Sequence, residues 1–396
     1  RQPSREALVF DTVFGLVRDR YVEPMESEAI LRTALQGMLD HLDPYSGYMP
    51  PADRTLLQDE TRGSFGGIGV VIETSMEPLT VRFPLPGGPA EQAGVGVGDR
   101  ITAVDGTALS ELGPGGATGL LRGPIGESVE VTLAPADGSK ERQVTLTRAS
   151  IPTPSVRDVA WAEVGAGLAY ARISSFTRTT ADELRSGLEA LEADDGTALR
   201  GLALDLRFAR GGLLDGAVDT ADLFIMDGRI VTTRGRDTEV PYNATAGATR
   251  WSGLPIALLV NGQTASASEV LAAALRDHHL ATLVGNHTFG KAQVQTVLQI
   301  NPQKGEPFGV RLTTALYETP SGASVPASAG LAVDVSIETT VEEESARERA
   351  FAAIEIPDAL RGQVREFRAA SGLDELRPPE ADRVLDAAVT DLRRRT

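Results

Sequence analysis

The chain has 396 residues, too many for one compact core, so two or three domains are expected. Hydrophobic residues make up 41% and charged residues 23%, and no apolar run approaches the roughly 18–20 residues needed to span a bilayer. A formal net charge of −17 argues against nucleic acid as a partner, and the absence of cysteine excludes thiol nucleophiles, disulfides and thiolate metal sites.

The N-terminal part of the chain, residues 5–42, has apolar residues at helical spacing, interrupted at Pro24. This pattern predicts two amphipathic helices. The turn-rich stretch 42–53 follows, and from Gly63 onward short β-like stretches alternate with glycines. We therefore expect a helical N-terminal segment over residues 1–64.

Residues 65–148 contain four or five short strand patterns and two brief helical ones, which predicts a small β-rich module over 65–150. From residue 167, apolar strand patterns alternate with helical patterns at 179–192, 212–226 and 266–277. Such alternation is typical of a mostly parallel sheet, so residues 151–340 are predicted to form an α/β core. The charged residues 341–396 are predicted to form a helical C-terminal segment.

Ser266 lies where an apolar strand pattern turns into an alanine-rich and leucine-rich helix. At such a turn its hydroxyl would be exposed, and the amide of Ala267 would point to the place where an oxyanion forms. A simpler interpretation is equally concrete, because Ser266 and Glu269 also fit the S-x-x-E capping box of a helix N-terminus.

Lys291 is one of two lysines in the second half of the chain and has Phe289, Ala292, Val294 and Val297 as sequence neighbours. A solvated lysine, with a pKa of about 10.4, is a useless base. Burial among apolar residues can lower that pKa to roughly 7–8, and a neutral Lys291 could then accept a proton from Ser266.

A phosphate-binding loop is a competing interpretation, because Gly285, Gly290 and Lys291 match the start of G-x-x-x-x-G-K. The next position is Ala292, which lacks the hydroxyl that binds magnesium. Residues 293–300 alternate like a strand instead of opening a helix that would hold phosphate. We therefore reject nucleotide binding.

A Ser-His-Asp triad would need one of four histidines. His278 and His279 fall at a predicted helix end, where the helix dipole already accounts for them. His287 lies beside Lys291 and is the alternative base. No HExxH pattern or carboxylate cluster indicates a metal site.

The double glycine Gly211–Gly212 follows the strand pattern LALDLR and precedes a predicted helix. Glycine permits a close backbone approach that other residues resist. One of the two amides is a candidate second donor to an oxyanion, although a plain turn between strand and helix explains the glycines equally well.

Several separated motifs resemble the C-terminal processing peptidases, also called tail-specific proteases. They are GMLDHLDPYS (37–46), GGIGVVIE (66–73), GGPAEQAGVGVGDRITAVDG (87–106), LLRGPIGESVEVTL (120–133), LDLR followed by GGLL, ASASE, TFGK and LYETPSGASV (316–325). The resemblance implies an α/β serine protease core with an inserted PDZ domain and helical flanking segments.

The resemblance implies a catalytic Ser/Lys dyad of Ser266 and Lys291, which are 25 residues apart as in the family. It also implies that Gln295 hydrogen-bonds the lysine, and that the amides of Ala267 and Gly212 form the oxyanion hole. No metal or organic cofactor is implied. The family usually has a polar, proline-containing turn before its double glycine, where this chain has residues 208–210, Phe-Ala-Arg.

For the PDZ domain, the resemblance implies that Gly67, Ile68, Gly69 and Val70 bind the C-terminal carboxylate of a substrate that adds as a strand. Arg122 is implied as a regulatory residue that reaches toward Gln295.

The expected function is therefore a serine endopeptidase that cleaves proteins near their C-termini through an acyl-enzyme. The alternative is a catalytically inactive PDZ-based peptide-binding scaffold. Expected partners are unfolded proteins or peptides with an exposed C-terminus, and a second copy of the chain or an adaptor protein is a further candidate. Because the printed sequence begins at Arg1, we expect a signal peptide or anchor to precede it, and a location in the bacterial periplasm or cell envelope.

Overall fold

The computed structural model describes residues 3–50, 57–59, 61–73, 75–111, 119–245, 247, 249–301, 307–374 and 381–396. The chain divides into two compact units. Unit 1 comprises Arg1–Leu57, Thr233–Val240 and Gln293–Tyr317, and unit 2 comprises Gln58–Thr232, Pro241–Ala292 and Glu318–Thr396. The predicted boundaries at residues 64, 150 and 340 stay a prediction.

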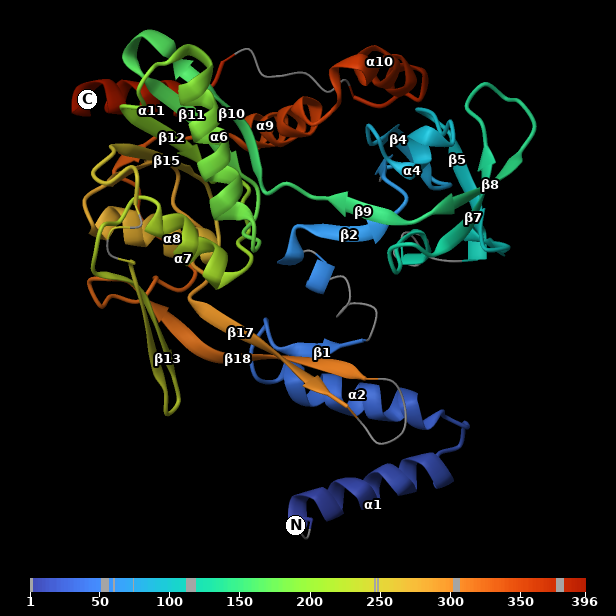
Figure 1. Cartoon of the computed structure of the whole chain (residues 1–396). Coiled ribbons are helices and arrows are strands. Elements are labelled where there is room, and N and C mark those ends of the chain that lie inside the picture. The colour runs from blue at the N-terminus through green and yellow to red at the C-terminus, as the bar shows by residue number, and fades with distance from the viewer. Residues whose placement is uncertain are drawn as a thin grey trace. The chain divides into compact units, whose positions relative to one another are not determined.

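Unit 1 contains both predicted N-terminal helices and strands from distant parts of the chain (Figure 1). Its elements are α1 (Arg5–Arg20), α2 (Ser27–Asp40), β1 (Gly47–Met49), β17 (Gln293–Ile300) and nearly all of β18 (Phe308–Glu318). Strand β18 pairs antiparallel with both β1 and β17. Helix α1 buries none of its residues, and α2 buries only Ile30 and Leu39. The apolar residues of α1 therefore do not supply a core in this chain.

The β-rich module lies in unit 2. Its elements are β2 (Ser64–Gly67), β3 (Val70–Glu73), β4 (Thr80–Pro84), α4 (Pro89–Gln92), β5 (Arg100–Val104), β6 (Thr107–Ala108), η1 (Leu109–Glu111), β7 (Ser128–Ala134), β8 (Arg142–Thr147) and β9 (Ala149–Pro152). The sheet order is β3-β4-β5-β7-β8, and β2 pairs with β9. Alternate residues of these strands, such as Val129, Val131 and Leu133, form a buried core of their own. Within the described residues β3 is an edge strand.

The α/β core also lies in unit 2 and contains a six-stranded sheet in the order β10-β11-β12-β15-β16-β19. Its strands are β10 (Val156–Glu163), β11 (Leu168–Ile173), β12 (Gly201–Asp205), β15 (Ile256–Val260), β16 (Ala281–Gly285) and β19 (Val335–Ser336). All neighbours are parallel except β10 and β11. Every residue of β12 and β15 is buried, as expected for central strands covered on both faces. The predicted mostly parallel α/β core is confirmed.

Helices follow the strands of this core, as predicted. They are α6 (Thr180–Asp195), α7 (Leu214–Asp222) and α8 (Ala267–Asp277), and η2 (Val164–Ala166) precedes β11. Helix α7 begins two residues later than expected because Gly211 and Gly212, with φ of 99° and 144°, are not helical. Strands β13 (Arg229–Gly235) and β14 (Glu239–Asn243) each have residues in both units.

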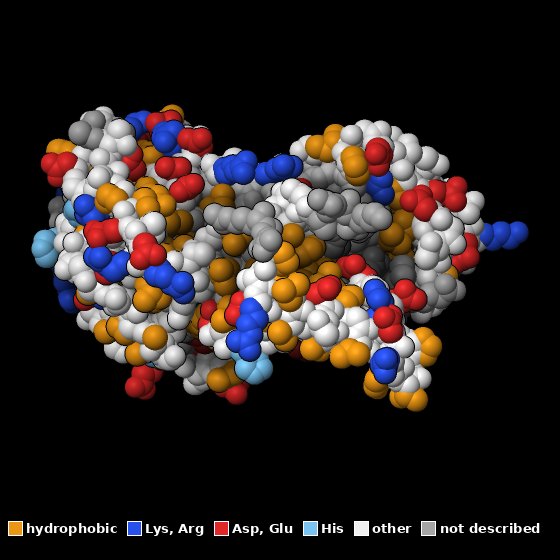
Figure 2. Space-filling view, turned by 90° about the horizontal axis from the view of Figure 1, so that it is seen from below, with side chains coloured by type: hydrophobic (Ala, Val, Ile, Leu, Met, Phe, Trp, Pro, Cys, Tyr) orange, Lys and Arg blue, Asp and Glu red, His pale blue; other side chains and the backbone are white. Residues whose placement is uncertain are grey.

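The C-terminal segment is helical, with α9 (Val341–Ile354), η3 (Asp358–Leu360), α10 (Arg361–Ala370) and α11 (Arg383–Arg395). Helix α11 buries Val384, Ala388 and Leu392 against the core sheet. Among the described residues no helix is both long and apolar enough to cross a bilayer. On the face shown in Figure 2, acidic, basic and apolar side chains are interspersed.

Candidate active site

Ser266 occupies a tight turn between a buried strand and a buried helix. Strand β15 ends at Val260, and the chain turns over residues 261–266 before α8 begins at Ala267. Ser266 has φ 58° and ψ −119°, a backbone conformation that is unfavourable for any residue with a side chain. A strained turn of this kind, between a strand and a helix, places the side chain at the end of the sheet. Ser266 is nevertheless buried, so the exposed hydroxyl expected from the sequence is not found.

The capping box expected from the S-x-x-E spacing is present at this turn. The Glu269 carboxylate accepts a hydrogen bond from the Ser266 amide at 2.8 Å. The Glu269 amide in turn faces Ser266, where it meets the side chain and also donates to the carbonyl oxygen at 2.8 Å. A hydroxyl that accepts an amide still has its own proton to donate, so the box leaves a chemical role for the Ser266 hydroxyl open.

Glu269 also connects the turn of Ser266 to the turn of Lys291. Its Oε2 accepts the amides of Ser266 and Lys291, each at 2.8 Å. Its Oε1 accepts the Thr288 hydroxyl at 2.5 Å and the Gly290 amide at 2.7 Å. Four donors thus converge on one fully buried carboxylate, which offsets much of its desolvation cost. This buried side chain brings together the two turns that the sequence singled out.

Lys291 is half-buried at the end of the turn 288–291. Ala292 is buried, but Phe289 is 46% exposed, so the apolar surroundings expected for the lysine are only partly present. Residues 293–300 form β17, as the argument against a phosphate-binding loop predicted. His287 is exposed, and its Nδ1 lies 2.9 Å from the Thr288 carbonyl oxygen.

The glycine turn, residues 208–212, lies against the turn that carries Ser266. A Cβ on Gly211 would come within 2.9 Å of Ser266 Cβ and 3.0 Å of the Ala267 amide nitrogen. Gly212 is bridged to Phe176, whose amide donates to the Gly211 carbonyl at 3.0 Å. Only glycine leaves the space in front of the Ala267 amide open, so an oxygen atom could be bound there.

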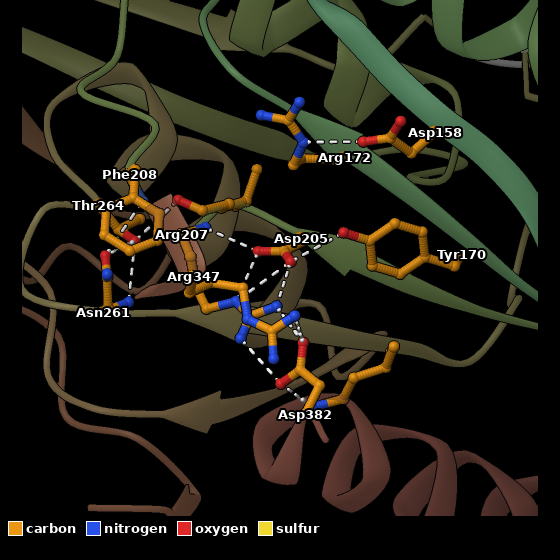
Figure 3. Close-up of polar contacts among 12 residues, drawn as sticks. Asp158, Tyr170, Arg172, Asp205, Arg207, Phe208, Asn261, Thr264, Arg347 and Asp382 are labelled. Atoms are coloured by element: carbon orange, nitrogen blue, oxygen red, sulfur yellow. Dashed lines mark hydrogen bonds and ion pairs between the residues drawn. The ribbon is translucent and has the colours of Figure 1, made fainter. Parts of the chain in front are cut away.

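A network of charged side chains fixes the strand end that leads into this glycine turn (Figure 3). Arg207 donates to Asp205 through Nε at 3.0 Å and to Asp382 through Nη1 at 3.0 Å and Nη2 at 2.8 Å. Tyr170 donates to Asp205 at 3.0 Å, and Arg347 forms an ion pair with Asp382 at 3.2 Å. The network joins β11, β12, α9 and the N-terminus of α11.

Burial and charge shift the pKa values of several groups in this network, among them Tyr170 and Asp382. Burial, and then the Asp205 carboxylate, raise the pKa of Tyr170 far above its ordinary value, so Tyr170 remains a neutral donor. Burial alone would raise the pKa of Asp382, but hydrogen bonds and charge from Arg207, together with Arg347, hold it below its usual value. Asp382 is therefore a carboxylate at neutral pH and can pair with both arginines.

The other predicted site residues lie in three places. Gln295 lies in β17 of unit 1, where its Nε2 is 3.4 Å from Thr313 Oγ1, and its role toward Lys291 stays a prediction. Arg122 stacks over the Phe65 ring at 4.3 Å from the centroid. The residues Gly67–Val70 join β2 to the edge strand β3. Within the described part of the chain, no group of three His, Cys, Asp or Glu residues is arranged to hold a metal.

The sequence interpretation did not assign a role to several residues of this site. Asp205 and Arg207 were quoted as part of a motif, and Glu269 only as a helix cap. The available signal for Asp205 and Arg207 was their charge at the end of an otherwise apolar strand pattern. Charges buried at such a position need partners, so the pattern indicates an ion-pair network.

Comparison with known proteins identifies the family. Residues 167–337 match peptidase family S41, residues 81–135 match the PDZ domain, and residues 4–52 match the activating protease CtpB N-terminal domain. The chain is similar to a carboxy-terminal-processing protease of Bartonella bacilliformis, at 35% identity over 337 residues, covering 84% of this chain and 75% of the relative. It is also 35% identical over 311 residues to a carboxyl-terminal-processing protease of Synechocystis, covering 77% of this chain and 71% of the relative.

Among solved structures, the chain is similar to a photosystem II D1 C-terminal processing protease, at 30% identity and a TM-score of 0.49, covering 87% of this chain and 97% of that one. The curated relatives show the class: the chain is a serine-type peptidase of family S41. Within that class it belongs to the C-terminal processing peptidases and contains a PDZ domain, as the sequence predicted.

Proposed function

We propose that this peptidase cleaves proteins near their C-termini with Ser266 as nucleophile and Lys291 as general base. The observation that carries the proposal is the Glu269 carboxylate, which accepts the amides of both residues through one oxygen atom at 2.8 Å each. This contact brings the ASASE and TFGK turns together and makes the pair a candidate dyad.

In the acylation step, the Ser266 hydroxyl proton passes to the neutral Lys291 amine while Oγ bonds to the scissile carbonyl carbon. The carbonyl electron pair moves to the oxygen, which the amides of Ala267 and Gly212 stabilise. The C–N bond then breaks, and the Lys291 ammonium gives its proton to the departing amine. An acyl-enzyme and a new N-terminus result.

In the deacylation step, Lys291 accepts a proton from water as the water oxygen attacks the Ser266 ester. The tetrahedral intermediate collapses, a carboxylic acid that ionises in water leaves, and Lys291 returns the proton to Ser266 Oγ. We propose that Gln295 hydrogen-bonds Lys291 and holds its amine in place between these transfers.

We further propose that the PDZ domain captures the substrate C-terminus at the loop Gly67–Val70, with the substrate adding as a strand to β3. Two observations support this mode. Strand β3 is at the edge of its sheet in the described residues, and Gly69 has φ 74°, which gives the loop its sharp turn. A substrate with a C-terminal carboxamide should therefore be cleaved more slowly than the same substrate with a free carboxylate.

Mutagenesis with an unfolded protein substrate tests the dyad. The wild type should cleave, whereas Ser266→Ala and Lys291→Ala should not. The rival function, an inactive PDZ scaffold, predicts that all three proteins bind C-terminal peptides equally and that none cleaves. A residual activity of Ser266→Ala above about one thousandth of wild type would contradict the proposed nucleophile.

The pH dependence of kcat/KM distinguishes the two candidate bases. A lysine base must lose its proton, so activity should rise from neutral to alkaline pH. A profile that titrates near pH 6.5 would assign the base to His287 instead.

We also propose an exported location, in the periplasm or cell envelope, because curated bacterial relatives are C-terminal processing proteases. Fractionation of a cell that makes the full-length protein tests this, and recovery in the cytoplasmic fraction would contradict it. The same material shows, by its size in solution, whether a second copy or an adaptor accompanies the chain.

A further inference from the structure

Phe208 begins the glycine turn of the active site in a backbone conformation that its side chain disfavours. Its φ of 64° is rare for a bulky residue and persists only where neighbouring groups hold it. The Phe208 amide donates to Asn261 Oδ1 at 3.1 Å. Its ring meets the ring of Phe351 edge-on, with centroids 5.9 Å apart and planes at 79°. One polar and one aromatic contact therefore hold the start of the turn.

Asn261 can accept the Phe208 amide only with its side-chain amide in one orientation. In that orientation Oδ1 accepts the amides of Phe208 and Gln263, each at 3.1 Å, while Nδ2 faces Glu344 Oε2 at 2.5 Å. A carboxylate accepts hydrogen bonds and cannot donate them, so Glu344 prevents the reversed orientation. The other oxygen of Glu344 accepts the Thr339 hydroxyl at 2.8 Å.

Glu344 and Phe351 both belong to helix α9 and are two helical turns apart, which puts them on one face of the helix. Arg347, between them on the same face, pairs with Asp382 of the network in Figure 3. This face of α9 therefore contacts Asn261 at the end of β15 and the residues that follow β12.

The glycine turn in turn contacts the nucleophile turn. The Ala209 carbonyl oxygen accepts the Ala265 amide at 3.1 Å and the Ser268 hydroxyl at 2.7 Å. Two residues later, Gly211 lies against Ser266 and the Ala267 amide. A shift of Phe208 would therefore move the groups that surround the candidate oxyanion site.

We propose that helix α9 positions the oxyanion turn of this peptidase through Glu344 and Phe351. Neither side chain touches the reacting atoms, so both are positioning residues. Glu344 acts by orienting Asn261, and Phe351 acts by packing on Phe208. The role of α9 also accounts for the unusual Phe-Ala-Arg turn. The Phe208 ring packs on the Phe351 ring of α9, and a polar side chain at position 208 would not make this contact. The inference rests on the proposed Ser/Lys mechanism.

A donor–acceptor exchange tests the role of Glu344. Asn261→Asp sets two carboxylates against each other, and kcat should fall about 10- to 100-fold with KM nearly unchanged. Adding Glu344→Gln restores a donor opposite the new carboxylate and the original total charge, so the double variant should regain most of the lost kcat. Glu348→Gln, on the exposed side of the same helix, is the matched control and should keep wild-type kcat.

A double-mutant cycle tests the role of Phe351. Phe351→Leu and Phe208→Leu should each lower kcat about 10-fold. The double variant should lose much less than the product of the two single losses, because the Phe208–Phe351 contact can be removed only once. Phe351→Leu also removes the stacking of this ring on Arg172 and Arg207, so the losses of the two single variants need not be equal. Melting temperatures are measured for every variant, and kcat is compared well below the lowest of them. If Asn261→Asp fails to fold, Glu344→Ala replaces it, with the same expected loss of kcat.

Two results would overturn the role of α9 in an enzyme whose wild type is active and whose Ser266→Ala variant is not. One is an exchange variant that stays as slow as Asn261→Asp although it melts like wild type. The other is a Phe351→Leu variant that melts at a lower temperature but keeps wild-type kcat. Activity that survives Ser266→Ala would instead contradict the proposed dyad.

Discussion

Glu269→Gln should separate the two turns of the proposed dyad with the loss of a single charge. Each carboxylate oxygen of Glu269 accepts two donors, from Ser266 and Lys291 on one side and from Thr288 and Gly290 on the other. A glutamine keeps one acceptor oxygen and presents an NH2 group to the other two donors. One or two hydrogen bonds to a charged group are lost, because the Thr288 hydroxyl can turn to accept from the NH2 group but the backbone amides cannot. At about 1.5–3 kcal/mol each, the total cost is about 1.5–6 kcal/mol.

Part of that cost should lower the free energy of unfolding. The rest should be relieved by a displacement of the Ser266 and Lys291 turns relative to each other. A displacement on the order of 1 Å costs about 100-fold in rate, so kcat should fall about 100-fold while KM changes little. The assays are kcat and KM on an unfolded protein substrate, well below the melting temperature, and urea unfolding of the same variant.

Glu183→Gln is the matched control. This α6 carboxylate accepts the Ser155 and Val156 amides and the Ser155 hydroxyl on Oε2, and the Thr179 hydroxyl on Oε1. A glutamine can keep the three contacts on Oε2, and the Thr179 hydroxyl can turn to accept from its NH2 group, so stability should fall by at most about 1.5–3 kcal/mol with kcat unchanged. Our account of Glu269 would be refuted if Glu269→Gln lost stability but kept kcat within about threefold of wild type.

Three further predictions follow from the site. Gly211→Ala should lower kcat at least about 10-fold, because the added Cβ would crowd Ser266. Gly253 is also at positive φ but lies in open space, so Gly253→Ala should only lower stability, by about 1 kcal/mol. Equal kcat in the two variants would contradict this prediction. Asp382 has a lowered folded pKa, so its contribution to stability is present above about pH 4 and is lost as the pH falls through the folded value. In urea unfolding between about pH 5 and pH 2, Asp382→Asn should therefore show a weaker pH dependence than wild type, and an identical dependence would exclude this origin. Arg122→Ala should change the rate of cleavage or its response to the substrate C-terminus, and unchanged activity and response would remove Arg122 as a regulatory residue.

The wider charge network has a consequence for the C-terminal segment. Asp382 caps α11 by accepting the Leu385 amide at 3.1 Å and also binds Arg207. The start of α11 and the end of β12 are therefore held by the same carboxylate. Removal of one partner of such a buried pair typically costs about 3–5 kcal/mol, because the other charge is left uncompensated.

The sequence by itself determined the elements of the core and the positions of its turns. The run that forms β15 is apolar throughout and the run that forms β12 is apolar up to Asp205. Such runs specify central strands of a parallel sheet because both faces are buried. Helix α8 begins at Ala267, directly after the predicted turn, because a cap residue and an acidic third position are local signals. Motif order and spacing then indicated the family, which the comparisons confirmed.

Only the tertiary structure decided which distant residues meet. Glu269 was predicted as the second half of a capping box, yet it also binds three groups of the turn 288–291, some 20 residues further along the chain. Helical spacing gives the face of α9 that carries Glu344 and Phe351, but it does not give the surface on which that face packs. The Phe-Ala-Arg turn was a departure with no local explanation until Phe351 supplied a partner for Phe208. Local patterns fix elements because their causes lie within a few residues, whereas a buried charge or an unfavourable φ is stabilised by groups that only the folded chain brings near.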